Sequence, residues 1–597
     1  MNVSRTFRVS VHMLPAEHHT LVRPVNTAPQ RNQLLRNFCA RHRVPLLATL
    51  PTLPLYAVWW AFLATGGGDL AAQDAWADFA SQHGRSAYNL FWYGGMHTAN
   101  YSLISPYLMA AVGVRTVTVV SGLAASWLAA VLVTRTGVRR PLGPALLCSL
   151  ALWCNVASGR TTFALGIALA LAACVHLTRE RRLVPTAGYA ALATMASPVA
   201  GLFLAVVGAA FLVVRDWWRA AGLMVPPALV VGVTTVFFPF TGEQLMPPSR
   251  IWPPVVLGLA VATLAPRSWR IARWSGAVYA AGTVVTYLVP SPVGTNVERF
   301  AELFAPAVLL AVLLGAPRMR SAGEVVSSLR ARGGWSRPAA EPHIDTAPRP
   351  LKALHLNGVH QSRLGRNLLI LALIFSVSWV GKKTVDDLQV STVVPAWASD
   401  TQPVVHTLER LGSGRTRVEA VPARDHREAS ELAPHINLAR GWNRQLDMER
   451  ARLFYDGTFS ASTYRAWLDH WAVGFVVLPE ATPDGYAKQE AVLVRYRRPD
   501  WLQPVWRDAH WRVYRVRDAV PLVSEPGRVV RTTSADLVVH VSRPGPVTVR
   551  VAYSPWLRAH GACLAKDGDF TRLTVPTAGE YRISSEYGRP SPAPTRC

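Results

Sequence analysis

The residues RHRVPLLATLPTLPLYAVWWAFLATGGGD, numbers 41–69, contain the pattern that decides the fold. Arginines precede an apolar run, 44–64, which is long enough to cross a bilayer as a single helix. Trp59 and Trp60 lie near its far end, where aromatic rings favour the membrane interface. Because basic flanks stay in the cytoplasm, the pattern predicts a cytoplasmic N-terminal tail, 1–43, and a first loop outside the cell.

The same alternation continues along the chain, because the densest arginine clusters fall in every second connection between apolar stretches. It predicts a polytopic α-helical protein of the plasma membrane with about eleven membrane segments. These form a multi-span domain over 44–316, a cytoplasmic linker over 317–366 and a last span over 367–380. We expect the stretch 183–214 to form two short helices, because Pro198 interrupts it and both of its flanks are basic.

The last third of the chain has the composition of a soluble protein, and the predicted orientation places it outside the cell. Residues 384–519 mix strand and helix patterns, which indicates an exterior α/β domain. Residues 520–597 alternate with a period of two between turn signals, which predicts an exterior β-sandwich. Cys563 and Cys597 both fall in this region, where a disulfide between them would persist.

The charge of the chain is strongly positive, with a formal net charge of +26, although only 16% of the residues are charged. Much of the excess is arginine next to apolar stretches, which serves topology and contacts with anionic membrane lipids. No basic stripe and no nucleic-acid motif is visible, so a nucleic-acid partner is not expected.

The first outer loop, 65–116, is rich in acids and aromatic residues. Asp69 directly follows the first span, and Asp74 and Asp78 would share one face of a short helix. A carboxylate at the membrane surface can take a proton from a sugar hydroxyl, or can bind a divalent cation together with other carboxylates. The alternative is that these acids only solvate an exposed loop.

Arginines on the outer side run against the usual bias and therefore indicate a site. Arg160 and Arg299 lie at the outer ends of spans, at the depth of a lipid phosphate, and Glu298 is adjacent to Arg299. Arginine binds phosphate oxygens through two parallel hydrogen bonds. The alternative is that each arginine extends to lipid headgroups. The outer arginines are Arg85, Arg115, Arg160, Arg250 and Arg299.

The early aspartates, the aromatic run ending at Tyr101–Tyr107, the short spans and the exterior C-terminal region together resemble the GT-C superfamily of membrane glycosyltransferases. The excess of Arg, Ala, Val and Pro is similar to that of actinobacterial members, which would fit arabinose or mannose on decaprenyl phosphate. The Asp-Glu pair familiar in that family is absent from the loop.

The resemblance implies inverting transfer of a sugar from a polyprenyl-phosphate donor to a glycan or lipid acceptor at the outer membrane face. It implies Asp69 as the general base and Asp74 as the second choice or a metal ligand. It further implies that four other residues bind the substrate. The two arginines would hold the donor phosphate, and the glutamate would orient the arginine next to it. These residues are Arg299, Arg160, Glu298 and His97.

Two other classes of function stay open. Residues 134–140 faintly resemble the loop motif of major-facilitator transporters, although its glycine and aspartate are missing and no internal repeat is visible. The other alternative is a non-catalytic cell-envelope assembly or carbohydrate-binding protein, in which exterior tryptophans stack on sugars or form the core. Those tryptophans are Trp442, Trp467, Trp471, Trp501, Trp506, Trp511 and Trp556.

Overall fold

The computed structural model describes residues 36–179, 182–315 and 363–588. Contacts divide the chain into a short N-terminal unit, Met1–Arg43, and a second unit, Val44–Cys597. The second unit is mostly helical in its N-terminal part and rich in strands after Ser391. The cytoplasmic linker that the sequence predicts, 317–366, lies outside the described residues except for its last four, which begin a helix.

The helical part begins with one continuous helical stretch. It consists of α2 (Arg43–Thr49), η1 (Leu50–Thr52), α3 (Leu53–Val58) and η2 (Trp59–Leu63). Prolines within the stretch remove backbone donors, and the helix type changes at these positions. The longer helices that follow residue 113 are α7 (Val114–Arg135), α8 (Leu142–Ala157), α9 (Thr161–Leu177), α10 (Leu183–Ala196), α11 (Pro198–Val213), α12 (Trp217–Phe237), α13 (Pro248–Leu264), α14 (Arg270–Leu288), α15 (Glu298–Gly315) and α17 (Arg363–Ser391).

Four helices of the described residues are long and apolar enough to cross a membrane: Arg43–Leu63, Val114–Arg135, Trp217–Phe237 and Arg363–Ser391. The helices α8 to α11 are apolar but have only 14 to 17 residues. At 1.5 Å per residue such helices measure about 21–26 Å, which is less than the hydrocarbon thickness of about 30 Å. The lengths of the helices therefore support a membrane location. They support fewer complete membrane spans than the eleven segments that the sequence predicts.

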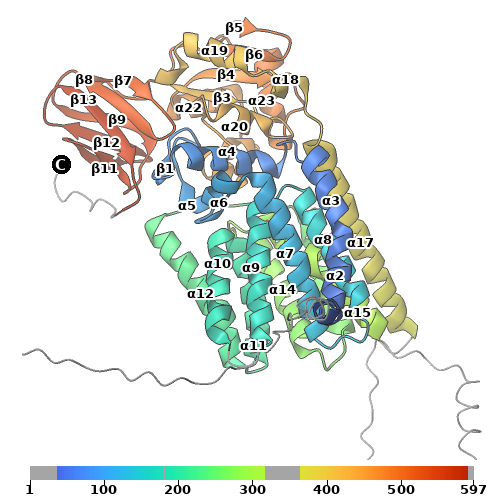
Figure 1. Cartoon of the computed structure of the whole chain (residues 1–597). Helices are drawn as coiled ribbons and strands as arrows, with labels where there is room; N and C mark the ends of the chain where they lie inside the picture. The colour runs from blue at the N-terminus through green and yellow to red at the C-terminus, as the bar shows by residue number, and fades with distance from the viewer. Residues whose placement is uncertain (1–35, 180–181, 316–362, 589–597) are drawn as a thin grey trace, which may run out of the picture. The chain divides into compact units, whose positions relative to one another are not determined.

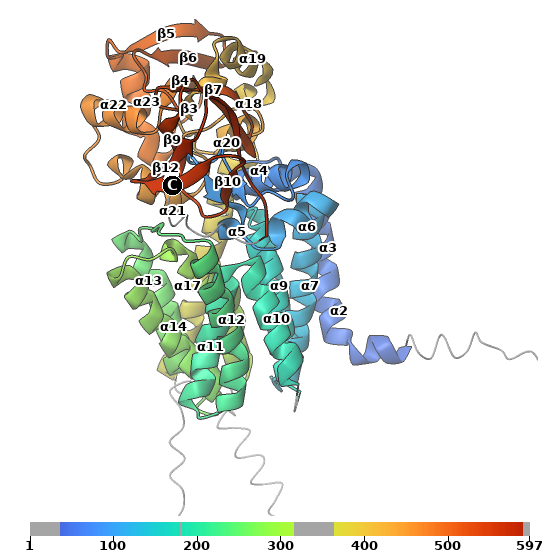
Figure 2. The same ribbon diagram turned by 90° about the vertical axis from the view of Figure 1, so that its left-hand side faces the viewer.

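The stretch 183–214 forms two helices, as the sequence predicts. α10 ends at Ala196 and α11 begins at Pro198, with Ser197 between them in an extended conformation. Pro198 disfavours helix in the residue before it and takes the first helical position, where its missing donor costs nothing. Figure 2 shows α10, α11 and α12, which pack against one another after this break.

The segment 65–116, which the sequence predicts to be the first outer loop, is folded. It forms α4 (Asp69–Gln82), the strands β1 (Tyr88–Asn89) and β2 (Met96–His97), α5 (Thr98–Tyr101) and α6 (Ser105–Val112). α4 contacts α7 and α9 of the helical part and also a helix of the C-terminal part, α20 (Arg427–Leu432) (Figure 1). This segment therefore joins the two halves of the chain.

The segment 396–516 contains a four-stranded mixed sheet in the order β3-β4-β6-β5. The strands are β3 (Arg417–Ala420), β4 (Val473–Pro479), β5 (Leu502–Arg507) and β6 (Trp511–Val516). β3 and β4 pair in parallel, and every residue of β4 is buried, as expected of a central strand. Its helical segments are α18 (Ala396–Ser399), α19 (Gln402–Arg410), η5 (Ser413–Arg415), α20, α21 (Arg444–Arg450), η6 (Arg452–Phe454), α22 (Ala461–His470), η7 (Gly485–Ala487), α23 (Lys488–Val492) and η8 (Leu493–Arg497).

The segment 527–585 is built from two antiparallel sheets, β10-β13-β8-β7 and β11-β12-β9. Alternate residues of these strands are buried and form one apolar cluster between the sheets. The strands are β7 (Gly527–Thr532), β8 (Asp536–Val541), β9 (Gly545–Ala552), β10 (Leu557–Ala559), β11 (Cys563–Asp567), β12 (Phe570–Val575) and β13 (Gly579–Ser585). Cys597 lies outside the described residues, so its pairing with Cys563 stays a prediction.

The hairpin formed by β1 and β2 inserts into both C-terminal cores. Tyr88, Leu90 and Phe91 pack into the cluster of the two-sheet segment, and Trp92 and Tyr93 pack into that of the mixed sheet. Backbone bonds reinforce this packing, since the Leu90 amide donates to the Ser534 carbonyl over 2.7 Å and the Ala552 amide donates to the Gly94 carbonyl over 2.9 Å. The C-terminal region therefore does not complete its own core, which sequence patterns alone do not reveal.

Candidate functional site

A polar cavity of about 480 Å³ lies between the helical part and the mixed-sheet segment. Its floor comes from α4, α15, α17 and the residue that precedes α9, and its roof comes from α21 and the loops around Tyr455 and Tyr486. The charged residues that line it are Asp69, Arg160, Arg250, Arg299, Lys383, Asp386, Asp387 and Arg444.

Asp69 is placed at this cavity by the turn that leads out of the first helix. Gly68 adopts a φ of +64°, a conformation that favours glycine, and a Cβ there would lie 3.2 Å from the Cβ of Ser391. The turn therefore requires glycine at this position. Directly after it, Asp69 opens α4, with 32% of its side chain exposed.

Two arginines converge on the Asp69 carboxylate. Arg160 Nε donates to Asp69 Oδ2 over 3.3 Å, and Arg299 Nη2 lies 3.7 Å from the same oxygen. Both arginines line the cavity, and the guanidinium of Arg299 also lies 5.1 Å from the centre of the Phe163 ring. The structure thus brings together three residues that the sequence singles out from three distant segments.

A second layer of acids holds the cations in place. Arg160 also contacts Glu302 at 3.2 Å and Asp387 at 3.1 Å, and Lys383 bonds to both Glu302 and Glu298. Each positive group therefore has an acidic partner, which offsets the cost of keeping these charges partly out of water.

Glu298 does not have the role that the sequence suggests for it. Its carboxylate is buried and contacts Lys383 and, at 3.4 Å, Arg250, rather than its neighbour Arg299. Consecutive residues of a helix point about 100° apart, so Glu298 and Arg299 face different surroundings. Arg299 is held by Asp69 instead.

Lys383 and Asp387 are site residues that the sequence reasoning missed. The last span was expected to end at residue 380, but α17 continues to Ser391 and carries both side chains into the cavity wall. The available signal was the charged sequence KKTVDD at 382–387, whose spacing of opposite charges supports a helix beyond the apolar part.

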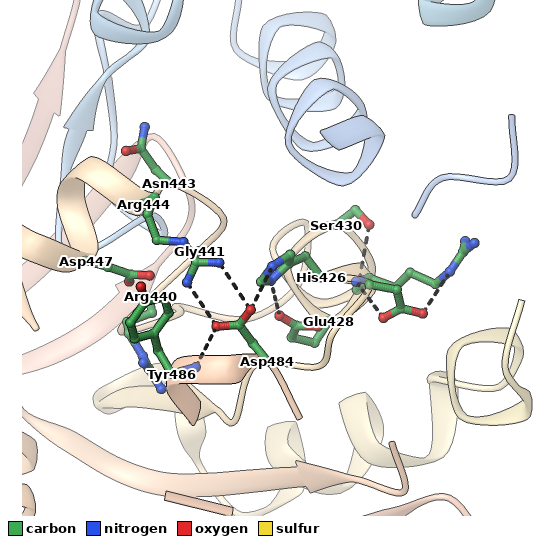
Figure 3. Close-up of polar contacts among 12 residues, drawn as sticks. His426, Glu428, Ser430, Arg440, Gly441, Asn443, Arg444, Asp447, Asp484 and Tyr486 are labelled. Atoms are coloured by element: carbon green, nitrogen blue, oxygen red, sulfur yellow. Dashed lines mark hydrogen bonds and ion pairs between the residues drawn. The ribbon is translucent and has the colours of Figure 1, made fainter. Parts of the chain in front are cut away.

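The roof of the cavity combines aromatic rings with one arginine, Arg444, whose pair with Asp484 is drawn in Figure 3. Arg444 pairs with Asp484 through two bonds of 2.9 and 3.1 Å, and its guanidinium lies 4.8 Å from the Trp442 ring and 5.1 Å from the Tyr486 ring. Burial alone would raise the pKa of Asp484, but its bonds to Arg444 hold that pKa well below the usual range. This pair stays ionised and fixes the roof.

Asp74 lies away from the cavity. It sits between α4 and α20, beside Gly66, in the field of Arg115, Glu431 and Arg427. Asp74 follows Asp69 by five positions. Because each residue of a helix turns by about 100°, the two side chains point about 140° apart around α4. Burial raises the pKa of Asp74 from 3.8 to about 6. The structure therefore does not support Asp74 as the alternate base in this cavity.

His97 also lies outside the polar cavity. Its Nε2 is 2.8 Å from the Ser554 hydroxyl, and its ring is buried against Tyr88 and Phe238. Burial, followed by the charge of Arg450, lowers the pKa of His97 to about 3, so the ring is neutral. His97 is thus part of the packing between the hairpin and the two-sheet segment, and it does not contact the Asp69 site.

The carboxylates do not assemble a metal site among the described residues, where no group of three His, Cys, Asp or Glu side chains has the geometry to hold a cation. Asp69 and Asp387 both approach the guanidinium of Arg160. A guanidinium between two carboxylates occupies the position that a cation would need. The divalent cation considered from the sequence does not fit this arrangement.

Comparisons with known proteins cover little of the chain. Residues 524–562, which begin before β7 and end before β11, match the family described as Domain of unknown function (DUF8823). No curated protein matches the chain significantly.

Proposed function

We propose that this chain is a membrane glycosyltransferase that moves a sugar from a polyprenyl-phosphate donor to an acceptor hydroxyl at the outer face of the plasma membrane. The observation that carries the proposal is the Asp69 carboxylate, which lies 3.3 and 3.7 Å from two guanidinium groups in one polar cavity. The cavity offers a base and a phosphate-binding surface within one small volume, which is what this transfer needs.

The cationic floor suits the donor phosphate. The guanidiniums of Arg160 and Arg299 present several donors each, and Lys383 and Arg250 add further positive charge to the lining. An incoming phosphate would take over donors that Asp69 now shares. That exchange would free the Asp69 carboxylate to accept a proton.

An apolar cavity next to this floor suits the polyprenyl chain. It has a volume of about 580 Å³ and is lined by residues of α7, α9, α11, α13, α14 and α15. Phe300 lines it, and Phe300 directly follows Arg299 of the polar cavity. A lipid phosphate at Arg299 would therefore have a neighbouring apolar space for its tail.

In the proposed transfer, one bond forms at the anomeric carbon and one breaks. The acceptor hydroxyl oxygen bonds to the anomeric carbon of the sugar while the bond from that carbon to the donor phosphate oxygen breaks. Asp69 takes the hydroxyl proton, and the leaving phosphate keeps the electron pair and is stabilised by Arg160 and Arg299. Attack opposite to the leaving phosphate inverts the anomeric configuration.

The topology remains part of the proposal. A multi-pass arrangement with the N-terminus in the cytoplasm would put the cavity at the outer face, where nucleotide sugars are absent and a lipid must carry the donor. The charged network lies at the starts of α4, α9 and α15 and in the C-terminal third of α17, rather than in the middle of long helices. Transporters need polar groups near the midplane, so this placement favours the transferase over the transporter.

Donor choice tests the proposal. Purified full-length protein in nanodiscs is given one labelled sugar either on polyprenyl phosphate or on a nucleoside diphosphate, with an oligosaccharide acceptor. We expect label to move from the lipid donor alone. Transfer from the nucleotide sugar would refute the proposed function. So would the absence of transfer from either donor for every pentose and hexose tested.

A further inference from the structure

A second cavity of mixed character lies among the hairpin, α21 and the two-sheet segment. Its volume is about 510 Å³, within the range of about 300–1,000 Å³ that is usual for small-ligand sites. It is distinct from the Asp69 cavity, because the two share no lining residue. His97, which lies outside the Asp69 site, is part of this second wall.

The lining of the second cavity has the chemistry that recognises sugar. Tyr553 is half-buried and supplies an aromatic ring onto which the C–H face of a sugar ring can stack, and the buried Trp471 forms part of the wall. Two acids and two bases, Glu449, Asp569, Arg450 and Lys566, surround them and can accept from and donate to hydroxyl groups. Because these four charges balance, the cavity favours a neutral polyhydroxylated ligand over an anion or a cation.

Some of these polar groups are positioned by the fold. Arg450 donates to the carbonyls of Tyr93 and Gly95, each over 2.6 Å, and its own carbonyl accepts from the Trp471 indole over 3.1 Å. By contrast, Lys566 on β11 and Asp569 just after β11 are exposed, and Tyr553 is half-buried after β9. The rigid part and the accessible part of the wall are therefore carried by different elements.

The two cavities lie on either side of one thin partition. Gln445 and Met448 of α21 line the Asp69 cavity, whereas Leu446, Glu449 and Arg450 line the second one. The helical period places Gln445 and Met448 on one side of α21 and Leu446, Glu449 and Arg450 on the adjoining side.

Two further segments show the same division. In α5, Tyr101 lines the Asp69 cavity and its neighbour Asn100 lines the second. Gly242 belongs to the loop that completes the partition, and a Cβ there would lie 2.8 Å from the Gln445 carbonyl oxygen. The loop therefore packs directly on α21, and the cavities are neighbours.

We propose that the second cavity binds the distal sugar residues of an extended oligosaccharide acceptor, whose terminal residue passes around α21 so that its hydroxyl reaches Asp69. The inference rests on the proposed function for the identity of the acceptor, but the binding of carbohydrate can be measured without any transfer. The acceptor is then a glycan chain and not a lipid. The inference also gives the β-rich end of the chain a role in selecting acceptors by length.

Binding by oligosaccharides graded in length tests the proposal. Probes are linear arabinan and mannan fragments, from monosaccharide to octasaccharide, titrated against full-length protein in nanodiscs. The variant Tyr553→Ala removes an accessible ring, and Lys566→Ala removes an exposed cation that the fold does not require. The matched control is Tyr496→Ala, because Tyr496 is 72% exposed and lines neither cavity.

We expect affinity to rise with chain length in the parent protein and the Tyr496→Ala control. Tyr553→Ala should weaken octasaccharide binding about tenfold, as truncation of a central aromatic contact does, and leave monosaccharide binding unchanged. In transfer assays it should raise KM for the octasaccharide at constant kcat. If Tyr553→Ala lowers the unfolding temperature, the same binding and transfer measurements are made on Lys566→Ala instead.

The two proposals fail in different ways. Length-dependent binding without transfer from a lipid donor would refute the proposed function and leave the carbohydrate site in place. Transfer that is equally efficient on short and long acceptors and insensitive to Tyr553→Ala would refute the second site and leave the transferase. Absence of any carbohydrate binding would also refute the second site.

Discussion

Replacement of Asp74 by asparagine should stabilise the protein at neutral pH. Asp74 sits in the contact between α4 and α20, and burial raises its pKa from 3.8 to about 6 despite the nearby Arg115 and Arg427. A carboxyl whose pKa is higher in the folded state stabilises the fold fully below pH about 4. That contribution is lost as the pH rises through about 6, because the folded protein must then keep a buried charge.

The size of the effect follows from the shift. A rise from 3.8 to about 6 corresponds to about 3 kcal/mol of lost stability once the carboxylate ionises. Asparagine cannot ionise, so Asp74→Asn should gain up to about that amount near pH 7.5 and nothing near pH 4. This gain separates a buried structural acid from a catalytic one, whose loss would abolish activity without changing stability.

The assay is thermal unfolding of the full-length protein in detergent, followed by tryptophan fluorescence between pH 4 and pH 8. Where unfolding is irreversible, the half-life at one fixed temperature replaces the midpoint. The matched control is Asp78→Asn, since Asp78 lies on the same helix and its carboxylate accepts from the exposed Gln82 amide. An Asp74→Asn variant that is less stable than the parent at pH 7.5, or equally shifted at every pH, would refute the reasoning.

Two further predictions concern the donor site and the C-terminal region. Arg299→Ala should weaken donor binding about tenfold to a hundredfold in a direct titration with polyprenyl phosphate, since it removes a charged phosphate contact. Unchanged affinity would remove Arg299 from the phosphate site. A fragment of residues 384–597 should fail to fold on its own, because it lacks Tyr88, Trp92 and Tyr93, which are buried in its two cores. A protease-resistant fragment with dispersed amide resonances would contradict this.

The positions of the helices and the strands could largely be predicted from the sequence. Apolar run length gives the first helical stretch, expected at 44–64 and observed at Arg43–Leu63, and Pro198 gives the break before α11. These features depend on neighbouring residues in the chain, so local patterns reveal them. The charged end of α17, after residue 380, was missed because the apolar run was taken as the whole helix.

The site could be predicted only in part, because it is assembled from distant segments. Asp69, Arg160 and Arg299 were singled out by their chemistry and their place at span ends, and the structure brings them together. The insertion of Tyr88 and Trp92 into the C-terminal cores was not predictable, since aromatic residues in an outer loop look alike whether they bind ligand or fill a core. His97 lines the second cavity and not the cavity of Asp69, a difference that the local sequence does not reveal.

The most direct test of the central claim is the single-turnover rate of sugar transfer by Asp69→Asn, measured beside Asp78→Asn. Both changes convert an aspartate of α4 to its amide, but only Asp69 lines the polar cavity. As the general base, Asp69 should account for about a hundred- to ten-thousand-fold of the rate, with donor binding retained in the variant. Asp78→Asn should transfer at the parental rate. Parental transfer by Asp69→Asn would contradict the account.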